Sequence, residues 1–273
     1  MTTTARTTAA KRTAATKRTP MDKVRKTALI AGIFYLITFI SIPTLALYGP
    51  VKNHADWILG PGGHAGVLAG GLLEVIVALA GIGTAVTLYP VVKRQNEGFA
   101  LGFAAVRVLE AGIIFTGVFS LLSLVTLQQN LGGTAGAHAA LVITGASHVA
   151  VYDWAFLLGQ SLMPAINALL LGTLMYQSRL VPRLIPVIGL TGAPLQLIAV
   201  FATLSGNIEH TSALAHLAAA PVAAWELSLG LWLVIKGFRP CSITTEIAAE
   251  PPGLHPVPEQ QQAPAQPPAA PVS

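Results

Sequence analysis

Charged residues are scarce in this chain: Asp, Glu, Lys and Arg make up only 10% of its 273 residues, whereas 53% are hydrophobic. A soluble globular domain typically carries about 25% charged residues. Lipid-facing helix surfaces cannot hold charge cheaply, so this deficit indicates a membrane protein. The net charge of +5 does not indicate nucleic-acid binding, because eight of the sixteen basic residues lie in the first 26 positions.

Cysteine and catalytic motifs are also lacking. Cys241 is the single thiol, which excludes an intramolecular disulfide framework. The hydrolase motifs GxSxG and HExxH, and a GxGD with paired acidic residues, do not occur. The histidines show no compact ligand spacing such as HxxxH within one helix. The sequence therefore predicts a protein that is not an enzyme, with no cofactor and no metal site.

Both ends of the chain are poor in bulky apolar residues. The first 20 residues repeat Thr, Ala, Lys and Arg, and the chain from Thr245 is rich in Pro, Ala and Gln. Such segments bury too little apolar surface to offset the entropy lost on ordering. We therefore expect disordered tails over residues 1–23 and 241–273, with the basic N-terminal tail attracted to anionic lipid head groups.

Six long apolar runs lie between these tails. A backbone in lipid must satisfy its own hydrogen bonds, so runs of about 20 apolar residues predict membrane-spanning helices. The expected fold class is all-α: a polytopic membrane protein whose residues 24–240 form a bundle of six transmembrane helices in the lipid bilayer. The predicted spans cover residues 27–48, 66–89, 101–127, 155–176, 184–204 and 213–235.

Lys and Arg residues fall almost entirely on alternate connections between these spans. With this topology, fourteen of the sixteen lie on one side of the membrane, Lys52 alone lies on the other, and Arg107 lies inside a span. The positive-inside rule places the Lys- and Arg-rich side in the cytoplasm. The sequence therefore predicts a multi-pass protein of the plasma membrane with cytoplasmic N- and C-termini.

A cluster of charged residues is predicted inside the membrane, although each charge costs about 2.5–3.5 kcal/mol at a helix centre. Arg107 and Glu110 are three residues apart and therefore neighbours on one helix face. At a rise of about 1.5 Å per residue, Arg107 and Glu226 lie at nearly the same depth, and Glu74 lies about 12 Å below the outer boundary. We expect Arg107 to bridge Glu110 and Glu226. The cluster is interpreted either as a packing clamp or as a substrate, ion or proton site in which Glu74 takes part.

Span four carries a polar stripe. Asp153 lies at its predicted outer edge, where interfacial water solvates it. Gln160, Pro164 and Asn167 continue the same helix face, because steps of seven, four and three residues return to one side. The stripe is expected to face the bundle interior, either for hydrogen bonding between helices or as part of a permeation path.

Four stretches carry a family resemblance: LYPVVKRQNEGFALGFAAVRVLEA, VYDWAFLLG, RLVPRLIPVIGLTGAPL and PVAAWELSLGLWLVIKGFRP. In this order they resemble a bacterial family of multi-pass membrane proteins, domain of unknown function 4386, over residues 24–240. The resemblance implies a bacterial plasma membrane and no particular reaction. It also implies that the recurring pattern of the family includes Arg107, Glu110, Asp153, Trp154, Arg183, Trp225 and Glu226.

Two classes of function follow. We expect a non-catalytic accessory or sensing component, which has an unidentified membrane protein or a second copy of this chain as its partner. The alternative is a small-molecule or ion transporter that uses the Arg/Glu cluster and the span-four stripe. Inverted repeats would favour transport, but the polar landmarks of spans one to three do not align well with those of spans four to six.

Overall fold

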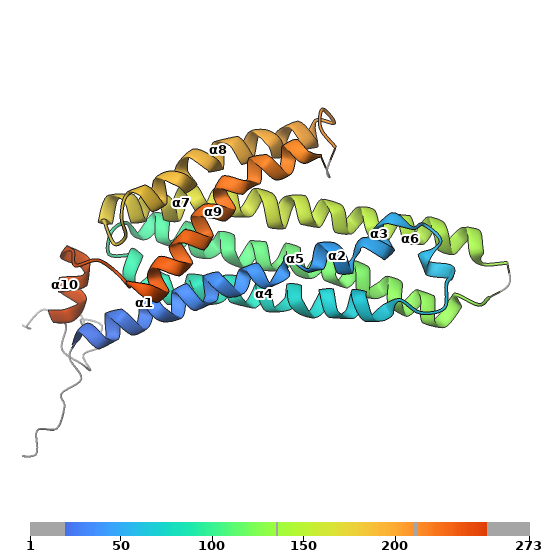
Figure 1. Cartoon of the computed structure of the whole chain (residues 1–273), viewed down its shortest axis with the longest axis horizontal. Coiled ribbons are helices and arrows are strands. Elements are labelled where there is room, and N and C mark those ends of the chain that lie inside the picture. Colours follow the sequence, from blue (N-terminus) through green and yellow to red (C-terminus); the bar gives the residue numbers. More distant parts are fainter. Residues whose placement is uncertain (1–19, 135, 210–211, 250–273) are drawn as a thin grey trace, which may run out of the picture.

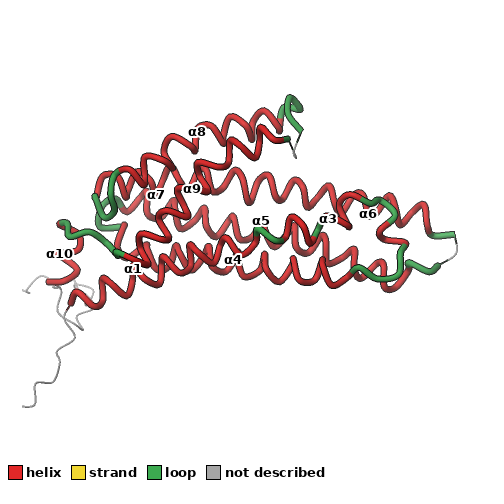
Figure 2. The backbone as a smooth tube through the Cα atoms, in the orientation of Figure 1, coloured by secondary structure: helices red, strands yellow, loops and turns green. Residues whose placement is uncertain are grey.

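The computed structural model describes residues 20–134, 136–209 and 212–249, and these residues are almost entirely helical, with no strand among them (Figure 2). The predicted tail segments 1–19 and 250–273 lie outside this part. The elements are α1 (Pro20–Ile37), η1 (Thr38–Ser41), α2 (Thr44–Leu47), α3 (Gly49–Asn53), η2 (Trp57–Leu59), α4 (His64–Val92), α5 (Glu97–Leu131), α6 (His138–Ala155), η3 (Phe156–Leu162), α7 (Met163–Ser178), α8 (Leu184–Leu204), α9 (Ala213–Ile235) and α10 (Ser242–Ala249).

Six helical segments of the described chain are long and apolar enough to cross a membrane, which confirms the expected all-α, multi-pass fold. The last two have the predicted bounds, and the second and third are longer than predicted. The segments are Lys23–Leu47, His64–Val92, Glu97–Leu131, His138–Ser178, Leu184–Leu204 and Ala213–Ile235.

The first span is interrupted rather than continuous. α1 ends at Ile37, and the chain goes on through the 3₁₀ turn η1 into the short helices α2 and α3. Side-chain hydroxyls compete for the backbone here: Thr38 donates to the Tyr35 carbonyl at 2.6 Å and Ser41 donates to the Thr38 carbonyl at 3.2 Å. Pro43 then lacks the N–H that a continuing helix would use.

The fourth segment is much longer than the predicted span. The sequence assigned residues 138–154 to a loop, but they form α6, which continues through η3 into α7 as one 41-residue segment. α6 packs against α5, and its Leu141 and Tyr152 side chains are buried. Within the segment, η3 is a π-helical stretch directly before Pro164, and such wide turns often mark functional sites.

Residues at the two predicted tail boundaries are helical, which corrects the sequence prediction there. α1 begins at Pro20, and Ser242–Ala249 forms α10 beside α1. Ile243 and Ile247 are four residues apart on one face of α10, and both pack on the main core cluster. Two apolar side chains on one helix face thus suffice to dock this short helix.

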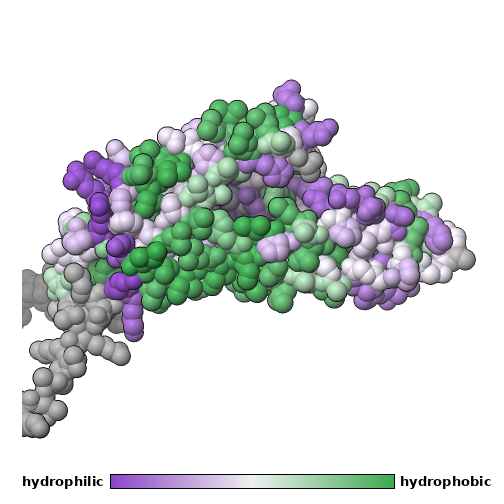
Figure 3. Space-filling model, viewed as in Figure 1, coloured by the Kyte–Doolittle hydropathy of each residue, from purple (hydrophilic) through white to green (hydrophobic). Residues whose placement is uncertain are grey.

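The described chain begins and ends at the same end of the bundle, where α1 and α10 lie side by side (Figure 1). We call this the basic end, because nine Lys and Arg residues of the described chain lie at helix ends or loops there: Lys23, Arg25, Lys26, Lys93, Arg94, Arg179, Arg183, Lys236 and Arg239. Apolar side chains dominate the middle of the face seen in Figure 3, between hydrophilic regions toward both ends.

The main hydrophobic core lies toward the basic end. The largest buried cluster joins residues of α1, α4, α5, α7, α8 and α9, including Leu88, Leu171 and Leu229. A Cβ atom on Gly32 of α1 would lie only 2.8 Å from the Gly230 carbonyl oxygen of α9. Arg25 ties the same two helices together by donating to the Leu233 carbonyl at the end of α9, at 2.8 Å.

Toward the opposite end, α8 and α9 lean away from the other helices (Figure 1), and Figure 3 shows a hollow with hydrophilic side chains between the two parts. This divergence leaves a space between the α8–α9 pair on one side and η1, α2, α5 and η3 on the other. We call this space the crevice.

Candidate functional site

The crevice holds two adjacent cavities. The outer cavity, of about 190 Å³, is lined by residues of α2, α3, α6, η3, α8 and α9. The inner cavity, of about 260 Å³, is lined mainly by residues of η1, α2, α5 and α9. Leu45, Phe156 and Gln160 line both cavities, so they form the boundary between them.

Arg107 of α5 joins two carboxylates in the wall of the inner cavity. Its Nη1 donates to both oxygens of Glu110, at 3.1 and 3.0 Å, and its Nη2 donates to Glu226 Oε1 of α9 at 2.6 Å. The Arg107 side chain is only 2% exposed. The structure thus brings together Arg107, Glu110 and Glu226, as their predicted depth in the membrane and their spacing in the sequence had indicated.

Three further side chains hold this cluster in place. Asn167 of α7 donates to Glu110 Oε2 at 2.9 Å. The guanidinium carbon of Arg107 lies 5.4 Å from the centre of the Tyr35 ring and 5.9 Å from that of Phe103, so the cation faces two aromatic rings. The cluster therefore connects α1, α5, α7 and α9.

Glu74 of α4 is buried apart from Arg107, unlike the single cluster that the sequence predicted. It is 1% exposed, and its hydrogen-bond donors are all neutral. Tyr152 donates to Oε1 at 2.8 Å, Gln160 donates to the same oxygen at 3.1 Å, and Tyr48 lies 3.4 Å from Oε2. Glu74 thus occupies a second polar site, in which hydroxyl and amide groups replace a cation.

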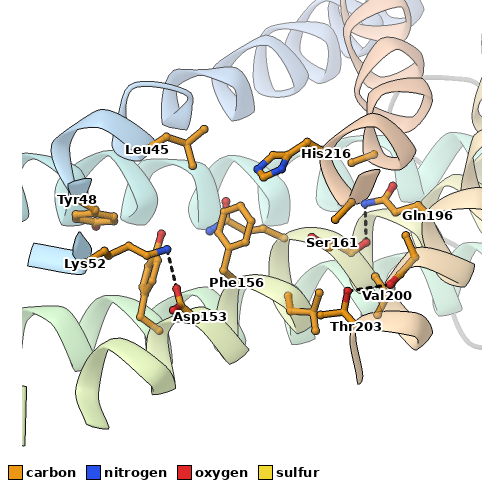
Figure 4. A pocket seen from close by; sticks show the side chains of 16 residues that line it. Leu45, Tyr48, Lys52, Asp153, Phe156, Ser161, Gln196, Val200, Thr203 and His216 are labelled. Atoms are coloured by element: carbon orange, nitrogen blue, oxygen red, sulfur yellow. Dashed lines mark hydrogen bonds and ion pairs between the residues drawn. The ribbon is translucent and has the colours of Figure 1, made fainter. Parts of the chain in front are cut away.

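Asp153 of α6 forms an ion pair with Lys52 of α3, with 2.6 Å between Oδ1 and Nζ. The sequence predicted that interfacial water solvates Asp153. In the structure Lys52, the lone basic residue on that side of the predicted topology, replaces part of this solvation. Figure 4 shows this pair on one side of Phe156 and the contact between Gln196 and Ser161 on the other. The pair lines the outer cavity.

The polar stripe of span four connects the two carboxylate sites. Gln160 reaches Glu74, and Asn167 reaches Glu110. Asn167 is buried, and Gln160 lines both cavities. The lower part of the stripe therefore points into the bundle, where it supplies hydrogen-bond donors between helices.

Sequence reasoning missed Gln196 of α8. This side chain lines the outer cavity and is 3% exposed. Its amide nitrogen donates to the Ser161 carbonyl of η3 at 2.9 Å, whereas Oε1 is buried without a hydrogen-bond partner among the described residues. Gln196 is the one amide of predicted span five. A single amide in an apolar run was the sequence signal that could have identified it.

Sequence reasoning also missed the tyrosines around the carboxylates. Tyrosines at the ends of apolar runs are ordinarily interface anchors, but the hydroxyls of Tyr48 and Tyr152 both contact Glu74. Glu74 lies about 12 Å below the predicted outer boundary, at 1.5 Å per residue. Tyr48 and Tyr152 could have been assigned to the same depth only if the interruption of the first span and the length of α6 had been known. The length of α6 arises from tertiary packing. The first span is interrupted at local hydroxyl and proline residues, but a proline alone does not predict this, because α4, α8 and α9 each continue through one.

One contact between a serine and a histidine lies outside the crevice. Ser120 Oγ lies 3.1 Å from His148 Nδ1, but it donates to the His148 carbonyl at 2.8 Å and lines neither cavity. Within the described residues, no group of three or more His, Cys, Asp and Glu side chains has the arrangement to hold a metal ion. The arrangement can bind a polar ligand through its carboxylates, amides and hydroxyls.

A family model described as a domain of unknown function (DUF4386) matches residues 30–237. This range includes all six apolar segments in whole or large part and every residue that lines the two cavities. The chain belongs to this family. The crevice and its Arg/Glu cluster therefore lie inside the DUF4386 domain rather than in the tails. Neither a curated protein nor a solved structure is detectably similar to the chain.

Proposed function

We propose that this DUF4386 protein is a non-catalytic sensing component of a bacterial plasma membrane, and that it binds a small molecule in the crevice. The observation that supports this proposal is that the Arg107–Glu226 ion pair lines a cavity of about 260 Å³. A clamp that served only to fix helix register would need no adjoining cavity. Concave sites with an apolar lining and a few convergent polar groups are typical of ligand binding.

The packing of the basic end favours a sensor over a conduit. The crevice reaches from the opposite end to the middle of the bundle, where the main core cluster begins. At this level Gly189 of α8 lies directly against the Trp225 ring of α9, since a Cβ there would be 2.7 Å from the ring. We therefore expect a ligand to enter and leave the crevice away from the basic end.

The charge distribution supports an orientation. Under the positive-inside rule the basic end faces the cytoplasm, which places both ends of the described chain there and opens the crevice toward the outside. The basic N-terminal tail then lies beside anionic lipid head groups. A partner that receives the signal would contact the cytoplasmic side or the lipid-facing helices.

Cysteine accessibility tests this function without knowledge of the ligand. Ala223→Cys in a Cys241→Ser background places one thiol in the wall of the inner cavity. A charged, membrane-impermeant thiol reagent is expected to modify it from the outside only. Val108→Cys in the same background is the matched control, because Val108 is exposed on α5 outside both cavities and faces lipid, where the thiol stays unreactive.

A transporter is the second candidate, and η3 is the observation that favours it. This π-helical stretch and Pro164 border the inner cavity, and α8 and α9 each contain an internal proline, Pro194 and Pro221. Such elements are able to change their local geometry. Modification of Ala223→Cys from both sides of the membrane would establish transport instead of sensing. Absence of modification from either side would show a closed packing clamp and contradict both functions.

A further inference from the structure

We infer that the ligand of the crevice carries an organic ammonium group, for which the Glu226 carboxylate is the counter-ion. The inference rests on the proposed binding function and adds the chemical class of the ligand. Among the described residues that line the inner cavity, the charged ones are Arg107, Glu110 and Glu226. One fixed positive charge thus faces two carboxylates. One further cation would bring these charged groups of the cavity to neutrality.

Glu226 is the carboxylate that remains available. Arg107 contacts Glu226 through Oε1 alone, whereas it binds Glu110 through both oxygens. Glu226 Oε2 has no hydrogen bond within the described chain and is not enclosed, since the Glu226 side chain is 14% exposed and lines the cavity. An ammonium group donating to Oε2 would form a charge-assisted hydrogen bond there.

Arg107 is not available for an anion. Its two terminal nitrogens already donate to Glu110 and Glu226. Its Nε has no partner, but this atom is buried, and the whole side chain is 2% exposed. A carboxylate or phosphate ligand would therefore meet Glu226 before it met an open donor of Arg107, and like charges repel in this low-dielectric position.

The other groups of the crevice suit the body of such a ligand. Ile42, Leu45 and Ile114 line the inner cavity and provide apolar contact for an alkyl chain. In the outer cavity the buried Gln196 Oε1 is an acceptor without a partner among the described residues.

Three probes of the same size test the inference on the unmodified protein in maltoside micelles: butylammonium, butan-1-ol and butyrate. Calorimetry is expected to show butylammonium binding at least about tenfold more tightly than the other two, because only it forms a charge-assisted hydrogen bond. Glu226→Gln should weaken butylammonium by at least about tenfold. Glu246→Gln is the matched control, because Glu246 lies on α10, outside both cavities, and should leave the affinity unchanged.

A second arm separates the two sources of an ammonium group. If phosphatidylethanolamine added to the micelles lowers the affinity for butylammonium and phosphatidylglycerol does not, the group belongs to a lipid head group. If neither lipid competes, it belongs to a water-soluble amine. Both results support the inference.

Preference for butyrate or butan-1-ol, or no binding of butylammonium, overturns the ammonium assignment. These results leave the sensing function standing as long as Ala223→Cys reacts from the outside. An unreactive Ala223→Cys removes the sensing function itself, so the two failures are distinguishable. Because the comparison of probes uses the unmodified protein, it stays decisive even if Glu226→Gln does not fold.

Discussion

At the residue scale, Arg107 acts as a junction between helices, because one guanidinium satisfies two carboxylates on α5 and α9. A buried charge that loses its partner is strongly destabilising, typically by about 3–5 kcal/mol. The two carboxylates depend on Arg107 more than Arg107 depends on either one, since it keeps a partner when one of them is removed. Substitutions at the three positions are therefore expected to be unequal.

Arg107→Met is expected to destabilise the protein by about 3–5 kcal/mol, because it leaves Glu110 and Glu226 inside the bundle without a cation. Glu226→Gln should cost less than half of this, since Arg107 still binds Glu110 through two hydrogen bonds. The free energy of unfolding in mixed micelles measures both. Equal losses for the two variants would show that Arg107 does not couple the carboxylates.

Tyr152→Phe is expected to destabilise the protein by about 1–3 kcal/mol, because it removes a donor from a buried carboxylate. Tyr48→Phe should cost less, since its hydroxyl lies 3.4 Å from Glu74 rather than 2.8 Å. Tyr89→Phe is the control, because its hydroxyl contact with Glu97 is exposed. Melting temperatures in micelles give the order, and a Tyr152→Phe variant as stable as the control would remove Tyr152 from the Glu74 site.

Depth and spacing were sufficient to predict that Arg107, Glu110 and Glu226 meet, because all three lie in spans whose ends the hydropathy locates well. Glu74 could not be separated from them in this way. Its true partners are Tyr48, the last residue of predicted span one, and Tyr152, which lies just before predicted span four. Aromatic residues at such positions are ordinarily interface anchors. Gln196 gave only a weak signal, a single amide in an apolar run.

At the element scale, the contact between α1 and α9 determines where the crevice ends. Small residues allow these helices to approach closely: Gly32 lies against the Gly230 carbonyl, and Gly230 lies against the Tyr35 and Leu36 side chains. Arg25 holds the same pair by donating to the last carbonyls of α9. The two helices are thus fixed at the basic end, while α9 is free to diverge further along.

Gly32→Ala is expected to destabilise the protein by about 1–3 kcal/mol, the range for overpacking a tight contact. The added Cβ would lie 2.8 Å from the Gly230 carbonyl oxygen and from the Val234 backbone nitrogen, and a backbone cannot rotate away. Gly112→Ala is the matched control: nothing lies within 4 Å of its Cβ position, so it should be neutral or stabilising. Thermal unfolding of the two variants checks the difference, and similar melting temperatures would contradict the close packing of α1 and α9.

The existence of all six spans could be predicted, because a long apolar run is a local property of the chain. The interruption after Ile37, the length of α6 and the docking of α10 could not. α6 belongs to a 41-residue segment that is about twice as long as a span needs to be, so span length accounted only for its second half; α6 itself is held by its contact with α5. α10 depends on Ile243 and Ile247 finding a core that is built by distant helices.

At the scale of the whole molecule, the single cysteine of the chain allows the membrane topology to be measured directly. Cys241 lies between α9 and α10, at the basic end. An impermeant maleimide is expected to label it in inverted membranes and not in intact cells, because the proposed orientation has the basic end in the cytoplasm.

The reverse pattern is expected for Asn207→Cys in a Cys241→Ser background, since Asn207 is exposed in the loop between α8 and α9 at the other end. Labelling of Cys241 in intact cells would invert the orientation. It would then place the mouth of the crevice in the cytoplasm.

The unequal lengths of the helices around the crevice shape the surface that the bilayer meets. α8 has 21 residues and α5 has 35, which corresponds to about 31 Å and 52 Å. The hydrocarbon layer is about 30 Å thick, and about 40–45 Å with its head groups. Both helices start at the basic end, so α8 ends near the head groups while α5 rises well beyond them. In the proposed orientation the mouth would be a step: its α8 wall would end at the leaflet surface, and its α6 wall, which packs on α5, would stand in water. An amphiphile from the leaflet and a solute from the water would then reach it at the same place.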